Sequence, residues 1–396
     1  MTPHRLHDAR AFLIAGGGIG GVSAALALAE RGIGVRVLEA EQEFSESGAG
    51  IQIGPNGSRI LRSWGLEPAL AQSAARPVSI LIRDGLSGNT LASVPLGEAA
   101  PARYGAPYFA TERRLLHRVL LEKASQKAEI EITSGFRLTS FRPLPSGIAA
   151  ISSDGREVAG QALIGADGVH STVRTLLFGR SARFSGRRAW RATASEGGRG
   201  AEAGAAVNLW LGCNAHLVHY RCGPKGPFNA VAITTGVPAT AGSGERAGDQ
   251  LLNAAFADWA AEPRRVLAGF EGWTVWPLHD LPLLNRWSEG AVTLLGDAAH
   301  ALMPFLGSGA VMAIEDAEVL AAEIVRAPDD PQSAFLAYEQ RRIPRMRRVA
   351  RSSARMGRVY HMSGAMRLAR NLALAAYPAN RLLARNDWLY GYSCAD

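Results

Sequence analysis

Three glycines near the N-terminus have the spacing that lets a backbone turn hold a pyrophosphate. Gly16, Gly18 and Gly21 follow a short apolar run at residues 11–15 and lead into an Ala- and Leu-rich segment at residues 22–31. The first glycine permits a tight turn, the second lets the backbone approach the phosphates, and the third lets strand and helix pack closely. The helix N-terminus adds free N–H groups and the positive end of a dipole. The turn therefore predicts a site for an adenine dinucleotide, NAD or FAD.

An acidic residue completes this pattern. Glu39 stands eighteen residues after Gly21 and closes a second apolar run at residues 35–38. Its carboxylate can accept hydrogen bonds from ribose hydroxyls, and its charge would repel a 2′-phosphate. Strand, helix, strand and acid thus form a βαβ unit in register; the alternative is a glycine-rich turn that binds no ligand. Ile19 in the turn and Ala40 beside the acid are the adjoining candidates for contact with the cofactor.

Two later turns each place an aspartate at the end of a buried strand. Asp167 follows the strand predicted at residues 157–164, and Asp297 follows the one at residues 291–295. Open α/β sheets bind ligands at the carboxyl ends of their strands, where Asp297 can accept a hydrogen bond from a ribityl or ribose hydroxyl. The loop after Asp297 leads into a helix whose first amides would stabilise an anion, such as the N1–C2=O region of a reduced flavin. The candidates in that loop are Pro304, Gly307, Gly309 and Ala310.

A loop of small residues follows the first βαβ unit. Residues 45–50 are rich in glycine and serine and lead into the alternating apolar pair Ile51 and Ile53. Small residues beside a dinucleotide site indicate close approach of the backbone to a flat ring. Gly50 and Ile51 are therefore candidates for lining that ring; the alternative is a flexible linker.

Candidates for handling a substrate lie on a strand predicted at residues 215–222. Alternation puts His216, Val218, Tyr220 and Cys222 on one face of that strand. His216 and Tyr220 could hold a phenol or a carboxylate, with His216 as a candidate base; the alternative is that both are structural. Arg191 and Trp210 are weaker candidates of the same kind, and His170 and His300 are expected to be structural.

The length of the chain and its patterning predict a two-domain α/β protein. A chain of 396 residues is too long for one core of ordinary size. The buried strands around the glycine turn predict a Rossmann-like dinucleotide-binding domain, and the alternating strands that follow predict an inserted antiparallel sheet. We assign residues 1–75, 103–182 and 280–340 to the first domain, 76–102 and 183–279 to the substrate-binding sheet, and 341–396 to a helical C-terminal segment.

The inserted sheet has a regular pattern of turn signals and alternating strands. Strands are expected at 187–195, 205–211, 215–222, 228–235 and 273–278, with a helix at about 249–260. A hairpin joins 78–84 to 90–94 through Ser87-Gly88-Asn89. The glycine-rich residues 242–248 resemble a second dinucleotide loop, but they contain one residue too many and no acid ends the next strand. We therefore expect one dinucleotide fold.

Charge and cysteine usage narrow the function classes. The net charge is +8, but twelve of the arginines, and no Asp or Glu, lie between Arg341 and Arg385, which leaves the rest of the chain at −4. Nucleic-acid binding is therefore not expected, while the basic segment could be a solvated helical face or could touch an anionic membrane or an acidic helix.

The three cysteines form no CxxC pair or metal cluster, so neither a metal site nor a disulfide reductase is expected. No targeting signal or bilayer-spanning run is evident, and we expect a cytoplasmic monomer or homodimer.

The motifs together resemble those of a known flavoprotein group. Gly16–Gly21 with Glu39, the stretch Ala166-Asp167-Gly168-Val169-His170-Ser171, and Gly296-Asp297-Ala298-Ala299-His300 occur in the order found in the group A aromatic hydroxylases, similar to salicylate and 3-hydroxybenzoate hydroxylases. The resemblance runs from Phe12 to about Tyr392. It implies bound FAD, transient NADH or NADPH as reductant, and hydroxylation of a phenolic or hydroxylated aromatic acid by O2 through a flavin C4a-hydroperoxide.

The resemblance also carries over site residues. Arg113 matches an arginine near the flavin and pyrophosphate, and Gly50-Ile51 matches the loop beside the isoalloxazine. Relatives often have an acid where Leu115 stands, and Gln and Asn where this chain has Ser308 and Val311. These departures fall at the edge of the flavin ring, where they would change how a substrate is oriented.

Four alternatives are distinguishable by simple features. A flavin halogenase would carry a Trp-x-Trp pair and a lysine near the N-terminus. In this chain Trp273 and Trp276 are three positions apart, and the first lysine is Lys123. A quinone- or isoprenoid-modifying flavoprotein would use the basic helices at a membrane surface. A plain dehydrogenase would purify colourless, and a non-catalytic flavin-binding protein would be yellow but would never oxidise NAD(P)H.

Overall fold

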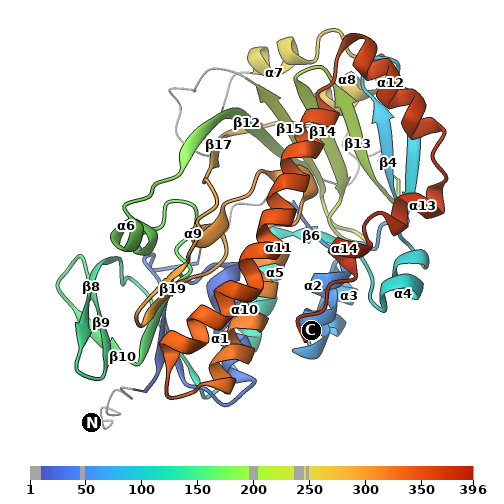
Figure 1. Ribbon diagram of the computed structural model, residues 1–396. Helices are drawn as coiled ribbons and strands as arrows, with labels where there is room; N and C mark the ends of the chain where they lie inside the picture. Colours follow the sequence, from blue (N-terminus) through green and yellow to red (C-terminus); the bar gives the residue numbers. More distant parts are fainter. Residues whose placement is uncertain (1–9, 45–49, 196–203, 236–244, 247–248, 396) are drawn as a thin grey trace.

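The computed structural model describes residues 10–44, 50–195, 204–235, 245–246 and 249–395 (Figure 1). The loop predicted at residues 45–50 lies outside these ranges except for Gly50, and most of the loop at 242–248 lies outside them too. Two large sheets organise the chain, one in the lower part of Figure 1 and one in the upper part. The mixed α/β class predicted from the sequence is confirmed.

A six-stranded sheet carries the glycine turn. Its pairs are parallel except at one edge, where β18 and β19 run antiparallel. The central strands are buried runs of apolar residues, as expected for strands covered on both faces. Helices α1 (Ile19–Ala29) and α10 (Gly309–Arg326) pack against each other. In spatial order the strands are β18 (Ser288–Glu289), β19 (Val292–Leu294), β11 (Ala162–Gly165), β1 (Phe12–Ala15), β2 (Val35–Leu38) and β7 (Ile130–Thr133).

An eight-stranded sheet forms the second layer. It combines the hairpin β4–β5 with the strands of residues 183–280. The expectation of a purely antiparallel sheet is wrong at one position, because β13 pairs with β4 in parallel. These two strands come from separate parts of the chain, so no hairpin fixes their relative direction. In spatial order the strands are β16 (Glu245–Arg246), β17 (Thr274–Asp280), β12 (Arg183–Ala194), β15 (Phe228–Thr235), β14 (Ala215–Arg221), β13 (Ala206–Gly212), β4 (Ser79–Asp84) and β5 (Thr90–Pro95).

One face of this sheet has its own hydrophobic core. Trp210 of β13 and Leu217 of β14 pack there with Phe256, Trp259 and Val266. The helix predicted at 249–260 is shorter in the structure, as α7 (Asp249–Ala255), and a helix that was not predicted, α8 (Ala261–Ala268), follows it. Pro263 lies in the first turn of α8, where proline is tolerated because the N–H groups have no intrahelical acceptor.

Smaller elements connect the two layers. The short antiparallel pair β3 (Gly50–Ile53) and β6 (Phe109–Glu112) lies between them, and the meander β8 (Leu138–Leu144), β9 (Gly147–Ser152) and β10 (Glu157–Gly160) flanks the six-stranded sheet. The remaining helices here are α2 (Pro55–Ser63), α3 (Glu67–Ser73), α4 (Ala99–Tyr104), α5 (Arg113–Ala124), α6 (Thr172–Phe178), α9 (Asp297–His300) and a 3-10 turn at Pro304–Leu306.

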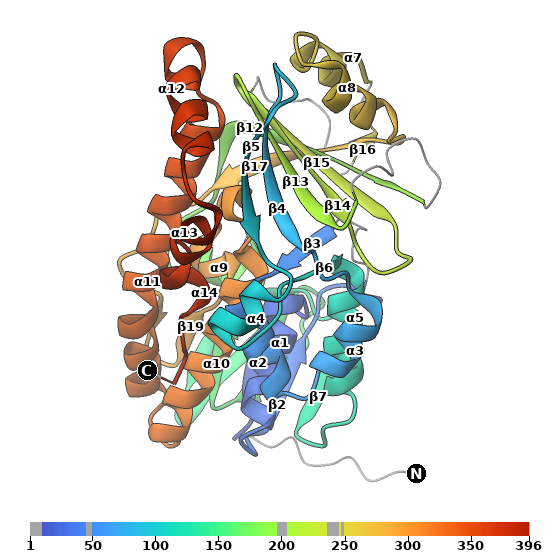
Figure 2. The same cartoon turned by 90° about the vertical axis from the view of Figure 1, so that its right-hand side faces the viewer.

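The C-terminal helices join the layers. Helix α11 (Pro331–Tyr360) runs from the six-stranded layer to the upper sheet (Figure 1). Helices α12 (Gly364–Ala375) and α13 (Ala379–Ala384) lie against β5 (Figure 2), and α14 (Asp387–Tyr390) packs near α2. Within the described residues, none of the helices combines the length and apolarity needed to cross a membrane.

The arginine-rich segment is not simply a solvated face. Arg342, Arg345 and Arg370 are all less than a tenth exposed and form ion pairs with acids elsewhere in the chain. Arg370 pairs with Asp84 of β4, as does Arg367. The expectation of a solvated or membrane-facing helix is wrong for these residues, because their partners lie far away in sequence and close in the fold.

Candidate active site

The glycine turn is shaped as a cradle with an open side. Gly16 has a φ of +103°, and a Cβ there would lie 2.7 Å from the carbonyl oxygen of Ala166. A Cβ on Gly21 would overlap the carbonyl oxygen of Gly16, whereas a Cβ on Gly18 would meet nothing within 4 Å. Helix α1 begins after Gly18 without a side-chain cap, so its first N–H groups face the open side. These features fit the pyrophosphate of a dinucleotide.

Replacing Gly21 by alanine is expected to destabilise the protein by about 1–3 kcal/mol, because the new methyl must push strand and helix apart. The same shift should weaken FAD binding, which flavin fluorescence measures on release. Gly34→Ala is the matched control, because a Cβ at Gly34 meets nothing within 4 Å. Equal FAD retention by the two variants would contradict the close packing described for Gly21.

Glu39 lies directly over this turn. Its Oε2 accepts a hydrogen bond from the backbone N–H of Gly17 at 2.6 Å, and its Oε1 accepts one from Glu41 at 2.9 Å. The carboxylate is therefore held at the edge of the cradle, next to Ala40. Its contact with a ribose stays a prediction, as do those of Ile19 and Ala40.

The two aspartate turns are joined by an arginine that the sequence reasoning missed. Arg174 is fully buried and donates to the carbonyl oxygens of Val169 (2.6 Å) and Ala298 (3.0 Å). The Asp167 carboxylate accepts from the backbone N–H groups of residues 172 and 173, so it caps α6. Asp297, in contrast, is exposed at the start of α9, where its carboxylate is free to accept a hydrogen bond from a hydroxyl group of a ligand. The cofactor roles of both aspartates stay predictions.

A second helix N-terminus lies beside the first. No side chain caps α10 at Ser308, and a Cβ on Gly309 would meet nothing within 4 Å. A Cβ on Gly20 of α1 would lie 3.4 Å from the Cβ of Ala313, so the first turns of α1 and α10 are in contact. Two neighbouring helix N-termini give one crevice a positive potential that suits a dinucleotide and an anionic ring. The loop with Pro304, Gly307 and Ala310 borders this crevice, and each of these contacts stays a prediction.

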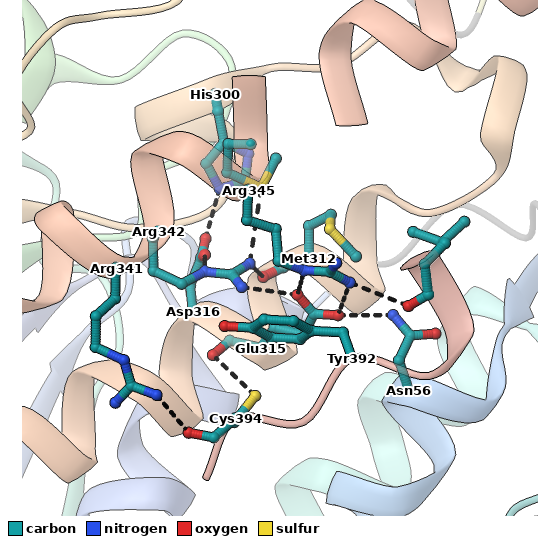
Figure 3. A network of polar contacts seen from close by, with 12 residues as sticks. Asn56, His300, Met312, Glu315, Asp316, Arg341, Arg342, Arg345, Tyr392 and Cys394 are labelled. Atoms are coloured by element: carbon teal, nitrogen blue, oxygen red, sulfur yellow. Dashed lines mark hydrogen bonds and ion pairs between the residues drawn. The ribbon is translucent and has the colours of Figure 1, made fainter. Parts of the chain in front are cut away.

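Behind the Asp297 turn lies a buried ionic network. Asp316 of α10 accepts from His300 Nε2 (2.5 Å) and from Arg342 Nε (2.6 Å) (Figure 3). It also accepts from the backbone N–H of Gly296 at 3.1 Å. Burial alone would raise the pKa of Asp316, but His300 and Arg342 outweigh it and lower that pKa to about 2. His300 is fully buried in this network, so it holds the turn, as the sequence suggested, and is not placed to act as a base.

Glu315 extends the network to the end of the chain. Its carboxylate accepts from Asn56 of α2, Arg342 and Arg345 at 2.6–2.7 Å (Figure 3). Arg345 also donates to the carbonyl oxygens of Trp388 and Leu389. Helices α2, α10, α11 and α14 are therefore tied to one carboxylate behind the cofactor crevice.

This network predicts sensitivity to acid. The pKa of Asp316 is depressed to about 2 from 3.8, so its contribution to stability is present above pH 4 and is lost as pH falls toward 2. A shift of this size corresponds to about 2 kcal/mol. Urea titrations from pH 6 to pH 3 should show the loss in wild type and a smaller loss in Asp316→Asn. A pH dependence identical in the two proteins would contradict this assignment.

A cavity of about 740 Å³ lies between the upper sheet and the C-terminal helices. Residues 304–307 border it, so it adjoins the cofactor crevice. The sheet side is apolar apart from His216, and Tyr360 is among the residues on the opposite side. The described part of its lining includes Arg355, Arg370 and Arg385 and no Asp or Glu. The sequence did not show that helices α11–α14 form a wall of this cavity.

His216 occupies the cavity as predicted from alternation. It is 2% exposed, and its ring lies 5.5 Å from that of Phe305 and 5.4 Å from that of Tyr360. Its Nδ1 is 2.8 Å from Nε2 of His361, at the end of α11. Burial, then His361 and Arg187, lower the pKa of His216 well below 6.5. The imidazole is therefore neutral at pH 7 and can accept a proton.

Tyr220 shares the face of His216 but not its cavity. It is 3% exposed and lines a separate cavity of about 490 Å³ that includes Arg76. A Cβ on Gly50 would lie 2.7 Å from the Tyr220 hydroxyl, so β3 passes close beneath it. Burial raises the pKa of Tyr220 well above 10, which keeps its hydroxyl protonated. Its catalytic role stays a prediction, and so does the contact of Gly50 and Ile51 with the cofactor ring.

The two weaker candidates have different outcomes. Trp210 is fully buried on the far face of the sheet and donates to His219 Nε2 at 3.0 Å, so the expectation that it contacts substrate is wrong. The reason is the strand alternation itself, which turns Trp210 toward α7 and α8. Burial and then the charge of Arg113 lower the pKa of Arg191 to about 10, although Tyr220 acts in the opposite direction. Arg191 and Arg113 therefore share the neighbourhood of Tyr220.

Comparison with known proteins places these features in context. Residues 10–353 match the FAD binding domain family. The chain is 34% identical over 383 residues to 3-hydroxybenzoate 6-hydroxylase of Polaromonas naphthalenivorans (strain CJ2), and 36% identical over 387 residues to 3-amino-4-hydroxybenzoate 2-monooxygenase PtmB3 of Streptomyces platensis. Each alignment covers 96% of both chains. The structure of Klebsiella pneumoniae HpxO complexed with FAD and uric acid superposes with a TM-score of 0.86, at 25% identity over 98% of both chains.

Proposed function

Because this chain belongs to the family of FAD-dependent aromatic hydroxylases, we propose that its substrate is a hydroxylated aromatic acid bound between the upper sheet and the C-terminal helices. The protein is an FAD-dependent monooxygenase, as its curated relatives are hydroxylases and monooxygenases. Those relatives give no support to a membrane-bound quinone-modifying enzyme or to a non-catalytic flavin-binding protein.

The single observation that carries the substrate proposal is the chemistry of the cavity. A neutral, buried imidazole stands in an apolar space whose described lining holds three arginines and no carboxylate. A phenol can donate to the imidazole, and the positive potential of the arginines favours an aromatic carboxylate over a cation. The two relatives described above are named as enzymes that act on hydroxylated benzoates.

The side chains of the protein orient and ionise the substrate, whereas the oxidising power comes from the cofactor. FAD, when bound in the crevice at the N-termini of α1 and α10, would supply the redox chemistry that connects NADH or NADPH with O2. His216 accepts the phenolic proton, which raises the electron density of the ring. The apolar side chains of the sheet and of Phe305 exclude water from the reacting centre.

A substrate panel tests the function. We expect at least one hydroxybenzoate, aminohydroxybenzoate or simple phenol to stimulate NAD(P)H oxidation, with matching O2 uptake and a product heavier by one oxygen atom or its decarboxylated equivalent. Hydrogen peroxide measured in parallel separates coupled hydroxylation from wasted reduction of O2. Absence of an oxygenated product across the panel would overturn the substrate proposal.

The assembly and the compartment also stay proposals. We propose a monomer or homodimer in the cytoplasm. Light scattering of the FAD-loaded protein measures the assembly, and any larger oligomer would contradict it.

A further inference from the structure

Two histidines from distant parts of the chain meet beside the cavity: His216 lines it, and His361 lies behind His216. His216 comes from β14, and His361 caps the C-terminus of the long helix α11. Their facing nitrogens, Nδ1 of His216 and Nε2 of His361, are 2.8 Å apart, a hydrogen-bond distance. One of the two must donate and the other accept, so the tautomers of the two rings are coupled: a proton on Nδ1 of His216 requires a bare Nε2 on His361, and the reverse.

Exposure increases from one histidine to the other. His216 is 2% exposed and is packed against Phe305 and Tyr360, whereas His361 is only partly buried. His216 as a whole is thus almost entirely enclosed by protein where it lines the cavity. The hydrogen bond to His361 connects it to a ring that solvent can reach.

The surroundings disfavour storage of a proton on the pair. The charged group that faces His216 is Arg187 of β12, and those that face His361 are Arg187 and Arg370. Arg370 is fixed in place, because it donates to the carbonyl oxygens of Val359 (3.1 Å) and Tyr360 (3.0 Å) and pairs with Asp84. Nearby cations make a lasting imidazolium unfavourable, so the pair is suited to passing a proton on.

We propose that His361 is a positioning residue that relays the substrate proton from His216 to solvent; this rests on the proposed phenolic substrate. The phenol gives its proton to Nε2 of His216, and His216 gives the proton on Nδ1 to Nε2 of His361. His361 then releases its own Nδ1 proton to water. The balance is one phenolate formed and one proton released, with both imidazoles left neutral in their other tautomers, and reversal of the steps returns a proton when the product needs one.

The test follows ionisation of a chromophoric phenol, 4-nitrophenol, on the FAD-loaded enzyme without NAD(P)H. At a pH where free 4-nitrophenol is mostly protonated, we expect rapid appearance of its phenolate band, with a matching proton release detected by a pH indicator. His361→Phe keeps a ring of similar size and should slow this step by about 10²-fold, the lower end of what a positioned proton acceptor contributes. The dissociation constant of the probe should change little.

A second variant and a matched control separate relay from structure. In His361→Ala, imidazole added to the buffer should restore the ionisation rate, an effect that a packing role would not produce. His279→Gln is the control, because His279 contacts the ring of another histidine, His170, and not that of His216. Unchanged ionisation in both His361 variants, or binding of the probe to wild type without ionisation, would overturn the relay. If the substrate panel still gives a hydroxylated product in that case, only the relay is wrong; absence of any product would count against the proposed function instead.

Discussion

Replacing Arg342 by methionine is expected to lower the free energy of unfolding by about 3–5 kcal/mol, the largest stability effect we predict for a single substitution. Arg342 is fully buried and donates to both Glu315 and Asp316. Methionine fills much of the space but leaves the two carboxylates short of a cation. Buried carboxylates that lose their partner are strongly destabilising, unlike pairs replaced as a whole.

The loss should also reach the cofactor. The carboxylate of Asp316 accepts a hydrogen bond from the backbone N–H of Gly296, one residue before Asp297. A shift of the Asp316 carboxylate therefore moves the turn that borders the crevice. We expect a lower urea midpoint together with faster release of FAD. Arg142→Ala is the control, because Arg142 and Glu157 form an exposed pair that should contribute less than about 1 kcal/mol. Equal midpoints for the Arg342 and Arg142 variants would show that the network does not stabilise the fold.

Replacing His216 by glutamine is expected to lower kcat for a phenolic substrate by about 10²–10⁴-fold, the usual contribution of a general base. Glutamine keeps a hydrogen-bonding group at the site but cannot take up a proton at neutral pH. NAD(P)H oxidation should become uncoupled from hydroxylation, which comparison of peroxide with product measures. His279→Gln should retain wild-type coupling, and full coupling in His216→Ala would remove the assignment of His216 as base.

The pH dependence of wild type gives an independent check. The pKa of His216 is well below 6.5 because it is buried next to His361 and Arg187. Its neutral form, the form that accepts a proton, therefore persists as pH falls through 6.5. We expect no loss of kcat between pH 8 and pH 6; a fall centred near 6.5 would mean that the base is an exposed histidine.

The sequence was informative where a local pattern decides the structure. Glycine spacing and flanking apolar runs predicted the βαβ unit at residues 11–39, and strict alternation predicted the strands that become β12–β15. Alternation also placed His216 on one face of its strand. Which face of the sheet borders the cavity depends on α7 and α8 covering the other, and that is a tertiary fact, so the sequence could not exclude Trp210 as a substrate contact.

The arginine-rich segment shows where local reasoning ends. A helix with Arg342, Arg345 and Arg348 predicts a polar surface, yet the first two lie in the interior. Their partners, Glu315 for both and Asp316 for Arg342, lie about thirty positions earlier and are recognisable only once α10 and α11 are packed. The same holds for Arg370 and Asp84, which are separated by 286 positions. Signals of this range are absent from a single sequence.

The placement of α11–α14 has a consequence for synthesis of the protein. The chain leaves the ribosome from its N-terminus, so both sheets can assemble while the wall of the cavity is still unmade. During that interval the apolar face with Leu209, Leu211 and Val218 lacks its cover, and the Glu315 carboxylate lacks Arg342 and Arg345. Nascent chains with exposed apolar sheets are prone to aggregate. Helices α11–α14 therefore form a wall of the cavity and, as they pack, also end the vulnerable phase of folding.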